Sequence, residues 1–220
     1  MKLLDIIKDE NLKGLITDIL ELELDNVIDN ESIKDIPIIG SVFKLYGVSK
    51  KISDYFLLKK IGKFLSGLED IEEELKNKFL MKDNKVLSEK LLIVLNQLNS
   101  EIKAELIGNL FKAYIEEKLS KDQLLEIIDA VEIIFINDLL ISAPLPTYMR
   151  NGYLGEIPLN TIMRLQSVGF ITKIEQRVLG GSDINYTDTF NRYEYSNSFR
   201  SLGIYCNETL LKYKSGLQNN

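Results

Sequence analysis

The sequence contains no histidine and no tryptophan, and Cys206 is the single cysteine among 220 residues. Without histidine the chain lacks the commonest general base and the commonest metal ligand. Ser-His-Asp and Cys-His catalysis are therefore excluded. Because the chain has a single cysteine, an intramolecular disulfide and a cysteine-based zinc site are excluded as well. We predict no catalytic residue, no metal site and no cofactor. The scarcity of cysteine also favours a reducing, intracellular compartment.

Long apolar runs are missing as well. No stretch reaches the roughly 18 apolar residues that an ordinary transmembrane helix needs. Charged residues follow the first methionine too closely for a secretory signal. We therefore expect a cytoplasmic protein, with peripheral contact at a membrane surface as an alternative. The net charge of −6 argues against general nucleic-acid binding, because phosphate contacts need a positive surface.

The residue types present are distributed unevenly along the chain. All five arginines lie at or beyond Arg150, and every earlier basic residue is lysine. Seven of the ten tyrosines lie at or beyond Tyr148, and three of the four prolines lie between residues 144 and 158. This change of composition predicts two domains, a helical body over residues 1–141 and a smaller module over residues 142–220.

The helical body is predicted from apolar residues that recur every three or four positions. Ser100 and Ser120 are expected to cap two of its helices at their first residues. The predicted helices cover residues 12–24, 68–81, 84–98, 101–119 and 120–136. We therefore expect a multi-helix bundle in this part of the chain.

One segment of this body, residues 37–68, is rich in lysine and has Asp54 as its single acid. On a helical wheel its later lysines fall opposite an apolar stripe, which is typical of a helix that lies on an anionic membrane or against a partner. An ordinary solvated face above a core stripe, or a nucleic-acid surface, are the alternatives. The residues predicted for membrane or partner contact are Lys44, Lys50, Lys51, Lys59, Lys60 and Lys63.

The C-terminal module is predicted to be a helix, a hairpin and a second helix. The helix over residues 159–168 ends at Gly169, strands are expected over residues 170–178 and 186–195, and a final helix covers residues 198–213. This order resembles the end of a winged-helix domain, so the predicted fold class is mainly α, with a small α+β winged-helix-like module. Its basic and aromatic residues suit protein contact, with structural packing and DNA binding as alternatives. The residues predicted for partner or nucleic-acid contact are Arg164, Lys173, Arg177, Arg192 and Tyr193.

Two further features have simpler interpretations. Asp122, Glu126, Asp129 and Glu132 align on one helix face and could hold a hard cation, but a solvated face is the preferred interpretation because the row faces away from most of the apolar stripe. A hydrolase that uses carboxylates alone is the enzymatic alternative. Cys206 lies in an apolar helix and is predicted to be buried packing rather than a nucleophile.

Parts of the body also carry a resemblance. The runs PIIGSVFKLYGVSKKISDYFLLKKIGKFLSGL and EKLLIVLNQLNSEIKAELIGNLFKAYIEEKLSKDQLLEIIDAVEIIFINDL resemble small helical proteins of bacteria. The layout, helical body first and winged-helix-like tail last, is similar to abortive-infection proteins of the alpha type. This resemblance implies a role in phage defence and supplies no functional residues.

The resulting hypothesis is a non-enzymatic, cytoplasmic interaction protein with an unknown protein partner. A winged-helix DNA-binding regulator, with residues 159–167 as its recognition helix and residues 178–186 as its wing, is the alternative.

Overall fold

The structure, a computed structural model, describes residues 6–7, 11–21, 52–81, 85–148, 151–154, 157–174 and 192–218. It is mainly helical and contains a small antiparallel sheet. The chain divides into two compact units, Met1–Ser120 and Lys121–Asn220.

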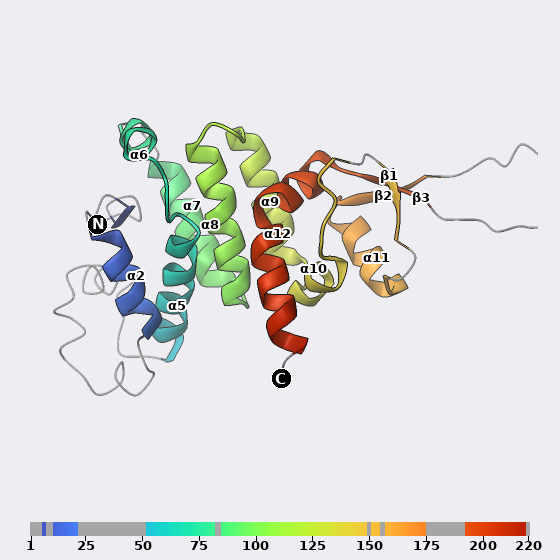
Figure 1. Ribbon diagram of the computed structural model, residues 1–220, viewed down its shortest axis with the longest axis horizontal. Coiled ribbons are helices and arrows are strands. Elements are labelled where there is room, and N and C mark those ends of the chain that lie inside the picture. The colour runs from blue at the N-terminus through green and yellow to red at the C-terminus, as the bar shows by residue number, and fades with distance from the viewer. Residues whose placement is uncertain are drawn as a thin grey trace, which may run out of the picture. The chain divides into compact units, whose positions relative to one another are not determined.

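The regular elements in the described part of the first unit are helices. Its helices are α2 (Leu12–Glu21), α5 (Ile52–Ser66), α6 (Glu73–Leu80), α7 (Lys85–Gln97) and α8 (Glu101–Ile115). Helix α5 packs against α2, α7 and α8, and α6 packs on α8 (Figure 1). The centre of this unit is fully buried and apolar, with Ile61, Phe64 and Leu65 of α5 against Leu106 and Phe111 of α8. Helix α5 is therefore the element around which the unit is built.

Helices α5 and α8 approach each other through two glycines. A Cβ atom added at Gly108 would meet the carbonyl oxygen of Phe64, and one added at Gly67 would lie 2.7 Å from the backbone nitrogen of Asn109. Any larger side chain at either position would force the two backbones apart. Glycine is needed here for close approach, which the apolar periodicity of the sequence does not reveal.

The second unit combines helices with the sheet. Its elements are α9 (Lys121–Ile133), α10 (Ile136–Ser142), β1 (Asn151–Tyr153), α11 (Leu159–Ser167), β2 (Ile171–Ile174), β3 (Arg192–Tyr195) and α12 (Asn197–Gln218). The strand order is β1-β3-β2 and both pairings are antiparallel. Ile171 is paired with Tyr195, and both side chains are buried. This pairing places α12 directly after the central strand.

Helix α12 holds the connector that follows α10. The Asn207 side chain accepts a hydrogen bond from the Leu145 N–H at 2.7 Å, and it donates one to the Leu145 carbonyl at 2.9 Å. One turn earlier, a Cβ atom at Gly203 would lie 2.5 Å from the Pro146 carbonyl oxygen. Gly203 therefore sits within a continuous helix because the connector backbone passes directly against it.

Most predicted helices and strands are confirmed, but several details differ: α6 begins at Glu73 rather than at residue 68, and Ser100 makes no side-chain capping hydrogen bond at the start of α8. The helix expected over residues 120–136 breaks at Ile134 and Phe135, where the backbone of Phe135 is extended, and α10 begins after it. Residues 151–153, expected to be loop, form β1. The compact units divide after Ser120 rather than at residue 141, because α12 packs on both α9 and α10. The assignment of residues 1–141 and 142–220 as independent domains stays a prediction.

Candidate functional site

The described lysines of the predicted contact surface are turned toward neighbouring helices. Lys59 Nζ donates a hydrogen bond to the carbonyl of Leu20 in the last turn of α2, and it lies 5.4 Å from the centre of the Tyr55 ring. The last carbonyls of a helix have no partner within the helix and carry its negative dipole end. Lys59 therefore stabilises the end of α2.

Lys60 has the same role at the end of α7, from a buried position. Only 8% of the residue is exposed, and its Nζ donates to the carbonyls of Asn96 at 2.8 Å and Leu98 at 2.9 Å. Burial lowers the pKa of Lys60 below its ordinary value, and the nearby Glu101 carboxylate opposes this shift. The expectation that Lys60 lies on an exposed face opposite the apolar stripe is wrong, because its ammonium is used inside the unit.

Lys63 forms an ion pair with Glu105 of α8 at 3.5 Å, and both side chains are largely buried. A long lysine stem lets the ammonium reach a neighbouring helix, which a helical wheel does not show. Lys44, Lys50 and Lys51 lie outside the described residues.

In the second unit, Arg164 of α11 is held by Asp138 of α10. Its Nε lies 2.5 Å from Asp138 Oδ2 and its Nη2 lies 2.6 Å from Asp138 Oδ1. Asp138 is 1% exposed and also accepts a hydrogen bond from the Thr161 hydroxyl at 2.7 Å. The hydrogen bond from Arg164 is the main reason that the pKa of Asp138 lies below its ordinary value. Arg164 therefore links α11 to α10 instead of projecting freely from the predicted recognition helix.

The other predicted contact residues of this unit differ in how far they are buried. Lys173 of β2 and Arg192 of β3 are exposed, whereas Tyr193 of β3 is buried. Tyr193 therefore contributes to packing, and the two cations are the described members of this group that lie on the surface. Arg177 lies outside the described residues.

Sequence reasoning missed an apolar surface beside Arg164. Leu159 and Met163 of α11 are 70% and 61% exposed, and Phe135 is 59% exposed. The Arg164 guanidinium carbon lies 5.3 Å from the centre of the Phe135 ring, so Phe135 is next to α11. We call Leu159, Met163 and Phe135 the α11 face. The spacing of Leu159 and Met163, four residues apart, was its signal in the sequence.

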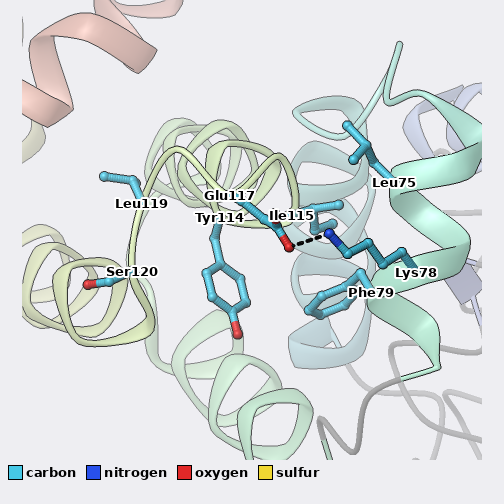
Figure 2. A pocket seen from close by; sticks show the side chains of 8 residues that line it. All are labelled: Leu75, Lys78, Phe79, Tyr114, Ile115, Glu117, Leu119 and Ser120. Carbon is cyan, nitrogen blue, oxygen red and sulfur yellow. Dashed lines mark ion pairs between the residues drawn. The ribbon is translucent and has the colours of Figure 1, made fainter.

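The first unit contains a pocket of about 220 Å³ between α6 and the end of α8 (Figure 2). Phe79 and Tyr114 contact each other edge to face in its wall, with ring centres 5.8 Å apart. An ion pair of 2.8 Å between Lys78 Nζ and the Glu117 carboxylate lies beside these rings. Burial raises the pKa of the Tyr114 hydroxyl, which therefore stays protonated at neutral pH.

The aligned acids of α9 are not collected into an ion site. The Glu126 carboxylate accepts a hydrogen bond from the Ser198 hydroxyl of α12 at 2.6 Å. Within the described ranges, no three acid, histidine or cysteine side chains converge as a metal site would require. Cys206 is buried in α12, as predicted.

Comparison of the chain with protein-family models, with curated proteins and with solved structures found no match. In the part of the chain that the structure describes, no helix combines the length and apolar character needed to cross a membrane.

Proposed function

We propose that the protein is a non-enzymatic interaction protein whose second unit binds a protein partner through the α11 face. The observation that carries this proposal is the exposure of Leu159 and Met163 on one side of α11, together with the exposure of Phe135 next to Arg164 of the same helix. Large apolar side chains that share a surface suit the water-excluding centre of a protein interface.

The charge of α11 supports a protein rather than a nucleic acid as the partner. Arg164 is the only basic residue in this helix, and its Nε and Nη2 both donate to Asp138. A helix that enters a DNA groove needs cations for the phosphates and polar side chains for the base edges. Leu159 and Met163 supply neither.

We also infer that the second unit is winged-helix-like and that the first is a multi-helix bundle. The order α11, β2, β3, with β1 on the far side of β3, supports the first inference. The packing of α5 against three other helices supports the second. The role in phage defence and the cytoplasmic location rest on the sequence alone.

Peripheral membrane contact would have to use residues other than Lys59, Lys60 and Lys63, whose ammonium groups serve neighbouring helices or Glu105. Lys44, Lys50 and Lys51 would then carry it.

A DNA-binding regulator is the second candidate. The exposed Lys173 of β2 favours it, whereas Arg192 of β3, also exposed, lies on the opposite face of the sheet, because Lys173 is paired with Tyr193 and Arg192 with Ile174. In this function strand β2, not α11, would supply the phosphate contacts.

The test places a photo-crosslinking amino acid at position 163 of the full chain in a bacterial host challenged with phage. The crosslinked molecule is identified and purified, and its dissociation constant for the parent chain is measured by calorimetry. We expect a protein, and we expect Met163→Glu to weaken its binding by about 30-fold, since a central apolar anchor contributes roughly 2 kcal/mol. The same variant should lose protection against the phage in a plating assay.

Lys212→Glu is the control, because Lys212 is exposed on α12 and tests the effect of a charge change on the same unit. An unchanged dissociation constant for Met163→Glu would reject the proposal. Crosslinking to DNA, with affinity that falls steeply as salt rises, would support the regulator instead.

A further inference from the structure

Arg164 of α11 has a second hydrogen-bonding edge that Asp138 does not use. A guanidinium can form two forked contacts, one through Nε and Nη2 along its side and one through Nη1 and Nη2 at its tip. Asp138 occupies the side, with Nε 2.5 Å from Oδ2 and Nη2 2.6 Å from Oδ1. The tip of the guanidinium is therefore available for a second partner.

This tip is open to solvent. In the described part of the chain, the Arg164 side chain donates to no acceptor other than Asp138, and Nη1 is not among the buried atoms that lack a partner. The Arg164 side chain is 37% exposed, whereas that of Asp138 is 1% exposed. The buried carboxylate thus holds one edge of the guanidinium and leaves the tip at the surface.

The exposed tip lies beside the α11 face. The Phe135 ring, which is 59% exposed, has its centre 5.3 Å from the guanidinium carbon. Met163 is the residue before Arg164, and successive residues of a helix point about 100° apart. A partner that covers the α11 face would therefore meet the tip of Arg164 as well.

The chemistry of the tip selects what this partner must supply. A guanidinium only donates hydrogen bonds and keeps its charge at physiological pH, so an amine or a second guanidinium does not fit there. A carboxylate accepts from Nη1 and Nη2 together, in the forked geometry that strengthens and orients such a contact. The planar cation would lie between this carboxylate and that of Asp138, which offsets the repulsion between the two anions.

A carboxylate suits this position better than the phosphates of a nucleic acid. Asp138 already balances the charge of Arg164, and α11 has no other basic residue. Nucleic-acid binding needs several cations that neutralise neighbouring phosphates. A single carboxylate next to apolar side chains needs one forked donor, which Arg164 supplies.

We propose that the partner of the α11 face carries an aspartate or glutamate next to its apolar anchor residues, and that this carboxylate binds the tip of Arg164. Arg164 is then the residue that sets the specificity of the surface. The inference rests on the proposed function, because a partner bound to Leu159 and Met163 brings the acid to Arg164.

The experiment selects 15-residue peptides from a random displayed library for binding to the full chain, and discards those that also bind Met163→Glu. We expect the remaining peptides to combine apolar residues with Asp or Glu. In the peptide that binds most tightly, replacing this acid by its amide should weaken binding to the parent about tenfold, measured by fluorescence anisotropy. This comparison requires no change in the protein.

Two variants separate the geometry of the contact from its charge. Arg164→Lys keeps the charge but lacks the fork, so it should bind the acidic peptide about tenfold more weakly than the parent does and the amide peptide nearly as well. Lys212→Gln removes an exposed cation of α12 in the same unit and should leave the binding of both peptides unchanged.

The possible results separate this inference from the proposed function. Peptides that depend on Met163 but carry no acid, or whose amide form binds as tightly, would overturn the inference and leave the proposed function in place. If no peptide depends on Met163, both fail. Displacement of the acidic peptide by a random-sequence DNA duplex would assign the tip of Arg164 to phosphates and would also overturn the inference.

Discussion

Lysine and arginine are used differently in the two units. In the first unit, Lys59 and Lys60 donate to backbone carbonyls at the ends of neighbouring helices. In the second, Arg164 presents two nitrogens to the buried Asp138 carboxylate. A lysine ammonium is a compact donor on a flexible stem and suits helix ends, whereas the planar guanidinium matches a carboxylate. A row of cations at helical spacing can therefore reflect internal packing as readily as an anionic partner.

The apolar residues of the two units differ in their exposure to solvent. Helix α5 buries its apolar stripe together with Lys60, whereas α11 leaves Leu159 and Met163 exposed. Lys60 is buried where the end of α7 needs a hydrogen-bond donor. Leu159 and Met163 are exposed because no described residue of the second unit covers them. Whether a side chain is buried or exposed thus depends more on which neighbouring backbone groups need a hydrogen-bond partner than on the residue type.

The largest effect on the free energy of unfolding should come from removing the carboxylate that binds Arg164. Asp138→Ala removes the acceptor for Arg164 and for the Thr161 hydroxyl at a buried position. We expect the free energy of unfolding to fall by about 2 to 3 kcal/mol, measured by urea denaturation at pH 7. Glu208→Ala, at an exposed acid on α12, is the control and should change it by less than about 0.5 kcal/mol.

The same carboxylate sets a pH dependence. The pKa of Asp138 in the folded chain lies below the value of about 3.9 expected for an unfolded aspartate. Its contribution is therefore fully present above pH 4 to 5 and is lost as the pH falls through the folded pKa. The parent should lose more stability than Asp138→Ala between pH 5 and pH 3. Parallel losses would show that Arg164 does not stabilise the ionised form.

Local signals made much of the fold predictable. The predicted helix over residues 84–98 corresponds to α7 (Lys85–Gln97), because both its periodicity and its ends are encoded within the segment. Gly169 ends α11 with φ of 73°, as its position after the last apolar residue indicated. Strand β1 could not be predicted, since its three residues pair with β3 some forty positions later and include a glycine.

The candidate sites were less predictable because they depend on contacts between distant segments. Arg164 and Asp138 are 26 positions apart, and Lys60 and Leu98 are 38 apart. A helical wheel describes one helix and gives no information about which neighbouring helix end needs a donor. The pocket wall likewise joins Phe79 to Tyr114 across two helices.

A smaller effect on the free energy of unfolding is expected when Lys60 is replaced. Lys60→Met keeps the apolar stem but leaves the carbonyls of Asn96 and Leu98 without their donor. We expect a loss of about 1 kcal/mol, because the cost of burying the ammonium disappears together with its hydrogen bonds. Lys13→Met, at an exposed ion pair, should cost less than about 0.5 kcal/mol and is the control.

The pH dependence of Lys60 has the opposite sign to that of Asp138. Burial lowers the pKa of Lys60, so the folded chain releases this proton before the unfolded chain does. Between the folded pKa and about 10.4 the unfolded state binds more protons, and stability from this group rises with pH. Denaturation curves from pH 7 to 10 should show a rise in the parent relative to Lys60→Met. A constant difference between the two proteins would indicate that the ammonium is not desolvated.

The smallest effect is expected at Lys214. It tests whether the contrast between the two units comes from the residue type or from the unit in which the residue lies. Lys214 belongs to the second unit, yet its Nζ donates to the carbonyl of Ala143 at 2.5 Å and approaches that of Ile141 at 3.4 Å, at the end of α10. Lys214→Met should lower the free energy of unfolding by about 0.5 kcal/mol, less than Lys60→Met, because these carbonyls can turn to water. Lys212→Met, two residues earlier on the exposed side of α12, should have no measurable effect. If Lys214→Met costs as much as Lys60→Met, burial does not set the strength of these lysine contacts, and the contrast between the units reduces to the chemistry of lysine and arginine alone.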